Sequence, residues 1–282
     1  MDIKIQAEKA EKLRKLHDGP RILALPNAWD AVSARILEEV GHPAIATSSA
    51  AMAFAHGYPD GQRISRSEML DAVARMTRAV RVPVTADLES GYGKTPEEIA
   101  DFTKALVAAG AVGLNFEDVT GDEESSQVEV GLQVKKIRTI RETAAALGVP
   151  VVINARTDVY LMPIGPEATR FERTVERLRA YREAGADCLF VPGVCDREII
   201  EKLVKALGAP VNILASQGCP SLEELEKIGV ARVSAGSSAM RAAMGAFQRV
   251  AKDWLAHGSY DSLTRVTIPY TELNRMMAQR TV

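Results

Sequence analysis

The sequence predicts an α/β protein built as one (β/α)8 barrel, the TIM-barrel fold. Short runs rich in Val, Ile and Ala recur eight times, and each is followed by a segment with helical periodicity. The length of 282 residues suits one such barrel, a fold that commonly takes about 250 residues. We expect residues 1–257 to form the barrel with an N-terminal helical arm, and residues 258–282 to form a helical tail.

The eight expected strands are apolar on both faces, which is typical of buried parallel strands. They are residues 22–27, 43–49, 82–89, 112–118, 150–158, 188–193, 210–216 and 232–236. Three helix starts are marked by a hydroxyl residue with a Glu three positions later. These pairs are Ser65 and Glu68, Thr95 and Glu98, and Ser221 and Glu224. The alternative, an open doubly wound sheet, is disfavoured because the first strand is not followed by a Gly-x-Gly-x-x-Gly segment.

Composition narrows the classes of partner. Lys and Arg total 35 against 37 Asp and Glu, with no long basic run, so nucleic acid is not an expected partner. No run approaches the roughly 20 apolar residues of a membrane span, and the N-terminus lacks the apolar core of a signal peptide. We therefore expect a cytoplasmic protein that binds a small molecule. Cys188, Cys195 and Cys219 show no metal-ligand or disulfide spacing, which predicts buried or reduced thiols.

The segment from Val82 to Gly93 runs from an apolar strand into two carboxylates, Asp87 and Glu89. Side chains two residues apart on a strand share one face, so these carboxylates should project together. Like charges at that distance repel unless a cation or a proton lies between them. The segment predicts a metal site, and the alternative is a solvated acidic turn.

Other strand ends add polar groups at the same rim, because catalytic groups of such barrels lie at the C-terminal ends of the strands. The predicted ends include Asn115, Glu117 and Asp118, then Asn154, Arg156 and Asp158. Oxygen ligands without a His or Cys cluster favour Mg2+, with Mn2+ as a second choice. Arg156 could hold a carboxylate or phosphate, or it could form a buried ion pair with Asp158 or Glu117. Residues 234–238 could bind phosphate on backbone N–H groups or cap the last helix.

Residues 87–93, 115–118 and 153–158 resemble the signature segments of the isocitrate lyase and phosphoenolpyruvate mutase superfamily. Residues 26–35, 47–50, 57–60 and 184–187 follow in the family order, so the resemblance covers essentially the whole chain. It implies a Mg2+-dependent barrel that acts on small 2-oxo or 2-hydroxy carboxylic acids through enolate-like species. It also implies a homodimer or homotetramer in which a C-terminal helix is exchanged between barrels.

The resemblance and the strand ends together give an expected site. The metal would be held by Asp87, with Glu89 and Glu117 binding it partly through water. The expected substrate-binding residues are Trp29, Asp30, Ser48, Ser49, Ala50, Asp60, Asn115 and Arg156. The expected catalytic residues are Arg156, Glu117, Glu123 and Ser126. The metal and Arg156 would neutralise charge as an enolate oxygen forms.

The loop at residues 119–131 departs from the family. It lacks the Cys-containing segment of isocitrate and methylisocitrate lyases and the Lys-x-Asn-Ser type segment of the mutases, and Pro192 stands where mutases place a histidine. The loop is long and polar, which favours a mobile lid over a plain surface loop, and Glu123, Glu124 and Ser126 are its candidate acid or base groups.

Three hypotheses follow for the function. The first is a Mg2+-dependent lyase or decarboxylase that cleaves a carbon–carbon bond in a small 2-oxo or 2-hydroxy carboxylic acid. The second is a phosphoenolpyruvate mutase or phosphonopyruvate-type enzyme acting on a P–C bond. The third, of a different class, is a non-catalytic protein that binds carboxylates in a metal-dependent way.

Overall fold

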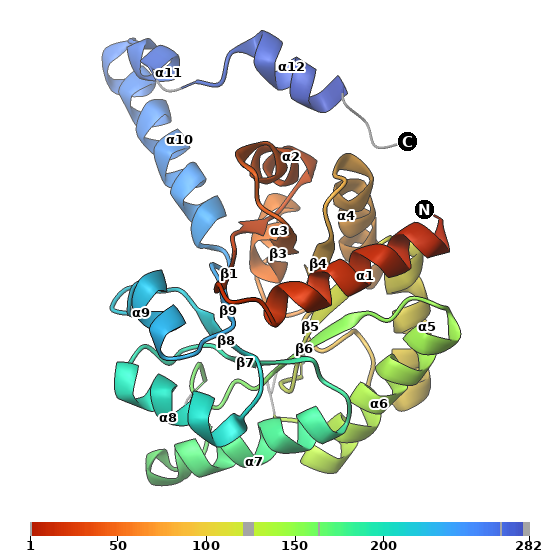
Figure 1. The fold of residues 1–282 in the computed structure, drawn as a ribbon. Coiled ribbons are helices and arrows are strands. Elements are labelled where there is room, and N and C mark those ends of the chain that lie inside the picture. Colours follow the sequence, from red (N-terminus) through yellow and green to blue (C-terminus); the bar gives the residue numbers. More distant parts are fainter. Residues whose placement is uncertain (1, 121–126, 163, 266, 279–282) are drawn as a thin grey trace.

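The computed structural model describes residues 2–120, 127–162, 164–265 and 267–278, which form a parallel barrel surrounded by helices (Figure 1). Nine strands in the described residues pair in the order β1-β9-β8-β7-β6-β5-β4-β3-β2. Strands β1 (Leu23–Leu25) and β2 (Asn27–Ala28) are separated only by Pro26, which has no N–H to donate to a ladder. Since β1 pairs with β9 (Arg232–Ser234) and β2 with β3 (Ile45–Thr47), this divided first strand closes the sheet. The predicted barrel is confirmed.

The other strands follow in the expected order. They are β4 (Val84–Asp87), β5 (Gly113–Glu117), β6 (Val152–Arg156), β7 (Cys188–Val191) and β8 (Val211–Leu214). The covering helices are α2 (Ala31–Val40), α3 (Ser49–Ala55), α4 (Arg66–Ala79), α5 (Pro96–Ala108), α6 (Val130–Ala146), α7 (Arg170–Glu183), α8 (Arg197–Leu207) and α9 (Leu222–Lys227), with a 3-10 turn at Glu167–Thr169. The capping boxes predicted at Ser65, Thr95 and Ser221 are all present and begin α4, α5 and α9.

The barrel interior is polar, so the expectation of strands that are apolar on both faces is wrong. Successive side chains of a strand point to opposite faces. The outward residues belong to the hydrophobic core between sheet and helices, and include Ala86, Leu114, Phe116, Ile153, Ala155, Leu189, Ile213 and Val233. The alternate residues form hydrogen bonds with one another across the interior, and include Asn115, Asn154, Asn212, Arg232 and Ser234. The hydrophobic core of this protein therefore lies between the outer face of the barrel and the surrounding helices, and not inside the barrel.

The N-terminal arm is helix α1 (Ile3–His17), which packs at the N-terminal end of the barrel. The buried Gln6 side chain donates to the carbonyls of Val107 and Ala111. Leu13 lies so close to Gly113 that a Cβ at that glycine would come within 2.8 Å of the leucine side chain. The arm thus fits tightly onto β5 and the loop before it.

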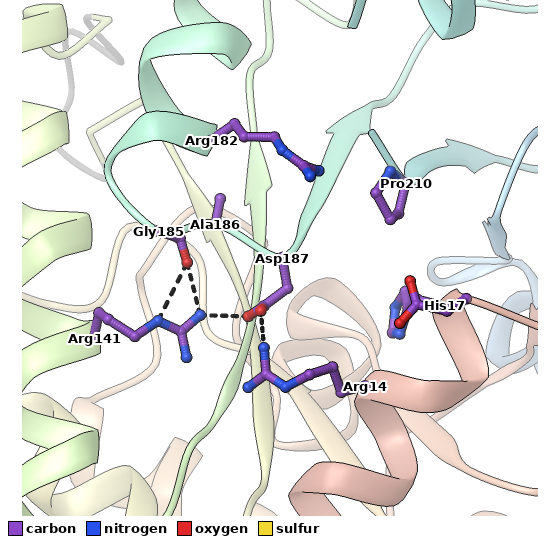
Figure 2. Close-up of a pocket in the computed structure, with 9 residues that line it drawn as sticks. Arg14, His17, Arg141, Arg182, Gly185, Ala186, Asp187 and Pro210 are labelled. Carbon is purple, nitrogen blue, oxygen red and sulfur yellow. Dashed lines mark hydrogen bonds and ion pairs between the residues drawn. The ribbon is translucent and has the colours of Figure 1, made fainter. Parts of the chain in front are cut away.

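A network of ion pairs joins the arm to the barrel, as Figure 2 shows. Asp187, just before β7, accepts from both Arg14 of α1 and Arg141 of α6, and also from the backbone N–H of Ile153. The remaining donor groups of the two arginines reach the carbonyls of Pro150, Val151 and Gly185. A cavity of about 480 Å³ opens here, but the charged groups that line its centre, Arg14, Arg141 and Asp187, are already paired with one another.

The C-terminal region begins with α10 (Ser238–His257), which extends away from the barrel, followed by α11 (Asp261–Arg265) and α12 (Tyr270–Ala278) (Figure 1). Helix α12 returns to α2, where the buried Arg35 donates to the carbonyl of Met276. Exchange of this region between subunits and the division at residue 257 both stay predictions. No helix in the described part of the chain is long and apolar enough to cross a membrane.

Cys195 and Cys219 form a disulfide, so the prediction of separate thiols is wrong for these two residues. They are 24 positions apart in sequence, but they follow β7 and β8, which are neighbours in the sheet. The hydroxyl of Ser216 lies beside the disulfide, 3.0 Å from the sulfur of Cys195 and 3.4 Å from that of Cys219. These loops lie together because β7 and β8 are neighbours in the barrel. The spacing of the cysteines in the sequence does not show this. Cys188 is a buried free thiol, as expected.

Candidate active site

A cavity of about 200 Å³ lies at the C-terminal ends of the strands. Seven of the predicted site residues line it: Ser48, Ser49, Ala50, Asp60, Asp87, Asn115 and Arg156. They come from the ends of β3, β4, β5 and β6 and from the start of α3 and the loop after it. The cavity therefore brings together residues expected from the strand ends, such as Asp87, Asn115 and Arg156, and residues expected from the family resemblance, such as Ala50 and Asp60.

Asp87 is the last residue of β4 and is held firmly on one side. Its Oδ2 accepts from the backbone N–H of Ser49 at 3.0 Å and from the Ser49 hydroxyl at 2.9 Å. Its own N–H donates to the hydroxyl of Thr47. The other oxygen, Oδ1, is buried and has no hydrogen-bond partner among the described residues. Ser49 thus orients Asp87, where a direct bond from Ser49 to the substrate was expected.

Glu89 lies beyond the end of β4, so the argument that it shares a strand face with Asp87 is wrong. Its φ of 54° is in the left-handed region, which costs a non-glycine residue free energy. The turn nevertheless buries the Glu89 carboxylate, and neither oxygen has a hydrogen-bond partner in the described structure. Burial, with Asp87 nearby, raises the pKa of Glu89 to about 8. Tyr92 in the same turn also has a φ of 54° and a buried hydroxyl without a described partner.

Arg156 faces the cavity and forms ion pairs with two carboxylates. Its Nη1 lies 2.8 Å from Glu117, and its Nε donates to Asp158 at 2.6 Å. The guanidinium also lies over the ring of Phe190, 5.9 Å from the ring centroid. Burial opposes the charge of Arg156, but Glu117 and Asp158 outweigh that effect and raise its pKa. Burial raises the pKa of Glu117 well above its usual value, although Arg156 acts in the opposite direction.

Asp60 contributes a carboxylate from the loop between α3 and α4. Its Oδ1 accepts from the backbone N–H of Gly61 at 3.0 Å. Partial burial raises the pKa of Asp60, and the charge of Asp87 acts in the same direction. The rim therefore gathers several carboxylates that disfavour one another's ionisation.

Trp29 and Asp30 do not line the cavity. The Asp30 side chain caps α2 through the N–H of Ser33, and Trp29 packs against the hydrophobic core. Their role in substrate binding stays a prediction. Glu89 and Glu117 do not line the cavity either, but Glu117 contacts Arg156, which does.

Residues 121–126 of the loop expected to act as a lid lie outside the described residues, and these include Glu123, Glu124 and Ser126. Its two ends are joined by a bridge between Val119 and Gln127. Below them, Asp118 accepts hydrogen bonds from Thr157 and Tyr181 and pairs with Arg177. Asp118 thus fixes the base of the loop and is not part of the cavity.

One wall of the cavity is apolar and was not predicted. It consists of Leu161, Phe190, Pro192 and Leu214. Gly193 allows this wall to form, since a Cβ there would lie 2.7 Å from the backbone of Leu161. The two-residue period of a strand could have indicated Leu214, which shares a strand face with the polar Asn212, whereas β7 is apolar throughout and Leu161 lies in a loop whose position the sequence pattern does not predict.

Asn27 also lines the cavity and uses backbone donors that could otherwise bind an anion. Its Oδ1 accepts from the N–H groups of Ala235 and Gly236, at 2.8 and 2.9 Å. Ser237 occupies the N-cap position of α10 without a side-chain capping bond, so its predicted hydroxyl cap is absent. The segment proposed as either a phosphate site or a cap instead binds the side chain of Asn27.

Comparison with known proteins places the chain in a family. The family model described as phosphoenolpyruvate phosphomutase matches residues 13–255. The chain belongs to this family. A solved structure of a provisionally named lyase/mutase from Burkholderia cenocepacia J2315 is 39% identical, with a TM-score of 0.90, and the match covers 98% of this chain and 97% of that one.

Two curated relatives extend the family match to named enzymes. Oxaloacetate decarboxylase of Pseudomonas fluorescens is 29% identical over 270 residues, covering 92% of this chain and 90% of the relative. 2-Methylisocitrate lyase of Bacillus subtilis is 27% identical over 264 residues, covering 90% and 84%. The expected membership of the phosphoenolpyruvate mutase and isocitrate lyase superfamily is confirmed, and the homologues of the chain include lyases and mutases.

Proposed function

We propose that this chain is a divalent-cation-dependent lyase or decarboxylase that cleaves a carbon–carbon bond in a small 2-oxo or 2-hydroxy carboxylic acid. One observation carries the proposal. The guanidinium of Arg156 faces a small rim cavity beside Asp87, and the buried oxygens of Asp87 and Glu89 have no described partner. A cation bound by these carboxylates and an anion bound by Arg156 would therefore lie next to each other. Relatives named oxaloacetate decarboxylase and 2-methylisocitrate lyase support the same reaction class.

The donor set fits Mg2+, with Mn2+ as an alternative. Three buried acceptor oxygens, Oδ1 of Asp87 and both oxygens of Glu89, lack donors in the described structure. No three His, Cys, Asp or Glu side chains among the described residues converge closely enough to form a complete metal cage. Mg2+ binds few protein carboxylates directly and keeps several waters, so it needs only a small set of protein ligands. We propose Asp87 as the direct ligand, with Glu89 and Glu117 acting through water.

The lining residues would bind the substrate, stabilise the enolate and exclude water. A divalent cation held by Asp87, with Glu89 and Glu117 acting through water, would polarise the 2-oxo or 2-hydroxy oxygen of the substrate. Arg156, fixed by Glu117 and Asp158, binds the carboxylate next to that oxygen in two parallel hydrogen bonds. As the carbon–carbon bond breaks, CO2 or a carbonyl fragment leaves, and the bonding electron pair stays on the other fragment as an enolate, which the positive charge of Arg156 stabilises. Solvent takes up the hydroxyl proton of a 2-hydroxy acid and supplies the proton that converts the enolate into the product acid. The apolar wall of Phe190, Pro192 and Leu214 limits water at the reacting carbon.

Cleavage of a P–C bond is a weaker candidate. The backbone N–H groups of Ala235 and Gly236, at a place where barrels often bind phosphate, already donate to Asn27. Pro192 supplies no proton donor on the opposite wall. Both features favour a carboxylate substrate over a phosphonate.

The test is a substrate screen with the purified protein and Mg2+. The panel contains oxaloacetate, 2-methylisocitrate, 2,3-dimethylmalate and phosphonopyruvate. We expect carbon–carbon cleavage of at least one acid, and chelation of the metal should abolish it. Turnover of phosphonopyruvate alone would point to P–C chemistry. Mg2+-dependent thermal stabilisation by 2-oxo acids without any turnover would contradict the enzyme and favour a carboxylate-binding protein.

We also propose that the chain forms a homo-oligomer in which the C-terminal region covers a neighbouring subunit. Within the described residues of α10, only Met240 is buried, whereas Phe247 and Trp254 are 64% and 55% exposed. Large apolar side chains exposed together on one helix commonly mark an interface. Light scattering should give a dimer or tetramer, and Trp254→Glu should lower the mass. A monomeric wild-type protein would contradict this proposal.

A further inference from the structure

Arg232 is a fully buried cation in the barrel interior without a carboxylate ion pair among the described residues. It is the first residue of β9, so its side chain starts below the floor of the cavity. Its Nε lies 3.3 Å from the hydroxyl of Ser234, and its Nη2 lies 3.4 Å from Oδ1 of Asn115. Its Nη1 has no described partner. Five N–H groups thus make only two long hydrogen bonds.

Such a group is costly for stability. An arginine side chain stays protonated in proteins, and a buried charge without a counter-ion loses its hydration without compensation. Arg156 and Arg177, in contrast, each contact a carboxylate in the described structure, Glu117 and Asp118 respectively. The interior therefore holds a positive charge that no described protein carboxylate neutralises by contact.

Both partners of Arg232 line the cavity. Oδ1 of Asn115 accepts from Asn154 at 2.8 Å and from Arg232, so the amide oxygen is fixed toward the interior. The Asn115 amide carries its NH2 group on the side opposite the oxygen, and this leaves the donor for the cavity side. Ser234 is held similarly, between Arg232 and Asn212.

We propose that Arg232 is a positioning residue for the reaction: it orients Asn115 and Ser234 and places a positive charge beneath the developing enolate. The inference deepens the proposed function and rests on it. An anion that enters the cavity gains from this charge, and we expect an enolate to gain more than the substrate, because negative charge concentrates on the enolate oxygen as the bond breaks.

If Arg232 served only the fold, its replacement would lower thermal stability and leave kcat unchanged. If Arg232 becomes methionine, Asn115 and Ser234 lose one of the groups that orient them, but the remaining bonds with Asn154 and Asn212 still satisfy their buried oxygens. Exchange of a buried ion for an apolar side chain of similar length is often neutral or stabilising. The fold alone therefore does not require the charge.

The experiment compares Arg232→Met with Arg232→Lys, which keeps the charge. Thr85→Val is the control, because Thr85 is also buried and its hydroxyl has no described partner. We would measure kcat and KM on the acid turned over in the screen, the Kd of oxalate, a planar dianion resembling an enolate, and the thermal midpoint. For Arg232→Met we expect kcat to fall by about tenfold or more with little change in KM, and oxalate to bind about tenfold more weakly. Its thermal midpoint should be unchanged or higher.

Arg232→Lys should recover most of both losses, and Thr85→Val should match the wild type. Unchanged kcat and oxalate affinity in Arg232→Met would overturn the proposal, as would a loss of thermal stability with normal kcat per folded molecule. If the wild type turns over no acid of the panel, the proposed function fails, and oxalate binding alone decides. Weaker binding in the Met but not the Lys variant would then support the role of Arg232. Equal binding, or no binding by the wild type, would overturn it.

Discussion

The two ends of the barrel treat their charges in opposite ways. At the N-terminal end, Asp187 accepts from Arg14, Arg141 and a backbone N–H, and each guanidinium reaches backbone carbonyls as well. At the C-terminal rim, oxygens of Asp87 and Glu89 are buried without described partners. The left-handed backbone at Glu89 adds strain there.

This difference indicates which end stabilises the fold and which end is prepared for a ligand. Satisfied ion pairs between α1, α6 and β7 hold elements together. Unpartnered carboxylates and backbone strain lower stability, and such features gather where a ligand or a reaction makes use of them. Substitution of Asp87 at the rim and of Asp187 at the N-terminal end therefore tests the difference with the same residue type.

The largest contrast is expected between Asp87→Asn and Asp187→Asn. Asp87→Asn should lower kcat by about a thousandfold or more, because the proposed cation loses its direct ligand. Its stability should be unchanged or higher, since one charge leaves a group of carboxylates. Steady-state kinetics and thermal unfolding with and without Mg2+ would measure both effects. Retained Mg2+-dependent activity in Asp87→Asn would refute the assigned metal site.

The rim should also give the protein an unusual dependence on pH when no divalent cation is bound. The pKa of Glu89 rises from 4.5 to about 8 on folding, mainly through burial. The folded protein holds this proton more tightly than the unfolded chain, so stability should fall as pH rises between these values. The slope approaches about 1.4 kcal/mol per pH unit for one such group.

Urea unfolding from pH 5 to pH 8 in the presence of a chelator would measure this slope. Glu89→Gln should flatten it, because the neutral amide does not titrate. Mg2+ should flatten it as well by stabilising the ionised carboxylate. A wild-type stability profile that runs parallel to that of Glu89→Gln over this range would show that Glu89 is ionised without a metal.

The contrast between the ends also explains what the sequence could predict. Asp87, Asn115 and Arg156 were found because parallel strands deliver their last residues to one rim, a rule that needs no knowledge of contacts. Glu89 was placed correctly near the rim for the wrong reason, since the strand ends two residues earlier. Its burial depends on a turn whose backbone conformation the residue types do not specify.

The sequence contains the signal for the polar interior, although the strands were expected to be apolar on both faces. Asn-Phe-Glu at 115–117, Asn-Ala-Arg at 154–156 and Arg-Val-Ser at 232–234 alternate with the period of a strand. The disulfide and the wall at Leu161 could not be predicted in this way, because they depend on which loops the closed barrel brings together.

At the N-terminal end, Asp187→Asn should lower the free energy of unfolding by about 2 kcal/mol, because two guanidinium groups lose a charged partner. The kcat per folded molecule should remain that of the wild type, since Asp187 lies at the opposite end from the cavity. Chemical denaturation and active-site titration would separate the two quantities. A loss of kcat comparable with that of Asp87→Asn would show that the two ends are not independent.

His17 gives the smallest expected effect and reverses the direction of the pH dependence at the rim. Burial, together with the charge of Arg232, lowers the pKa of His17 from 6.5 to about 4. The unfolded chain binds this proton more tightly than the folded protein, so stability should fall as pH decreases from 6.5 toward 4. The loss should reach about 1 to 2 kcal/mol near pH 5. His17→Leu should reduce this acid sensitivity while Glu89→Gln leaves it in place, which urea titrations of both variants would measure. If His17→Leu shows the same acid sensitivity as the wild type, groups other than His17 determine how the arm responds to acid.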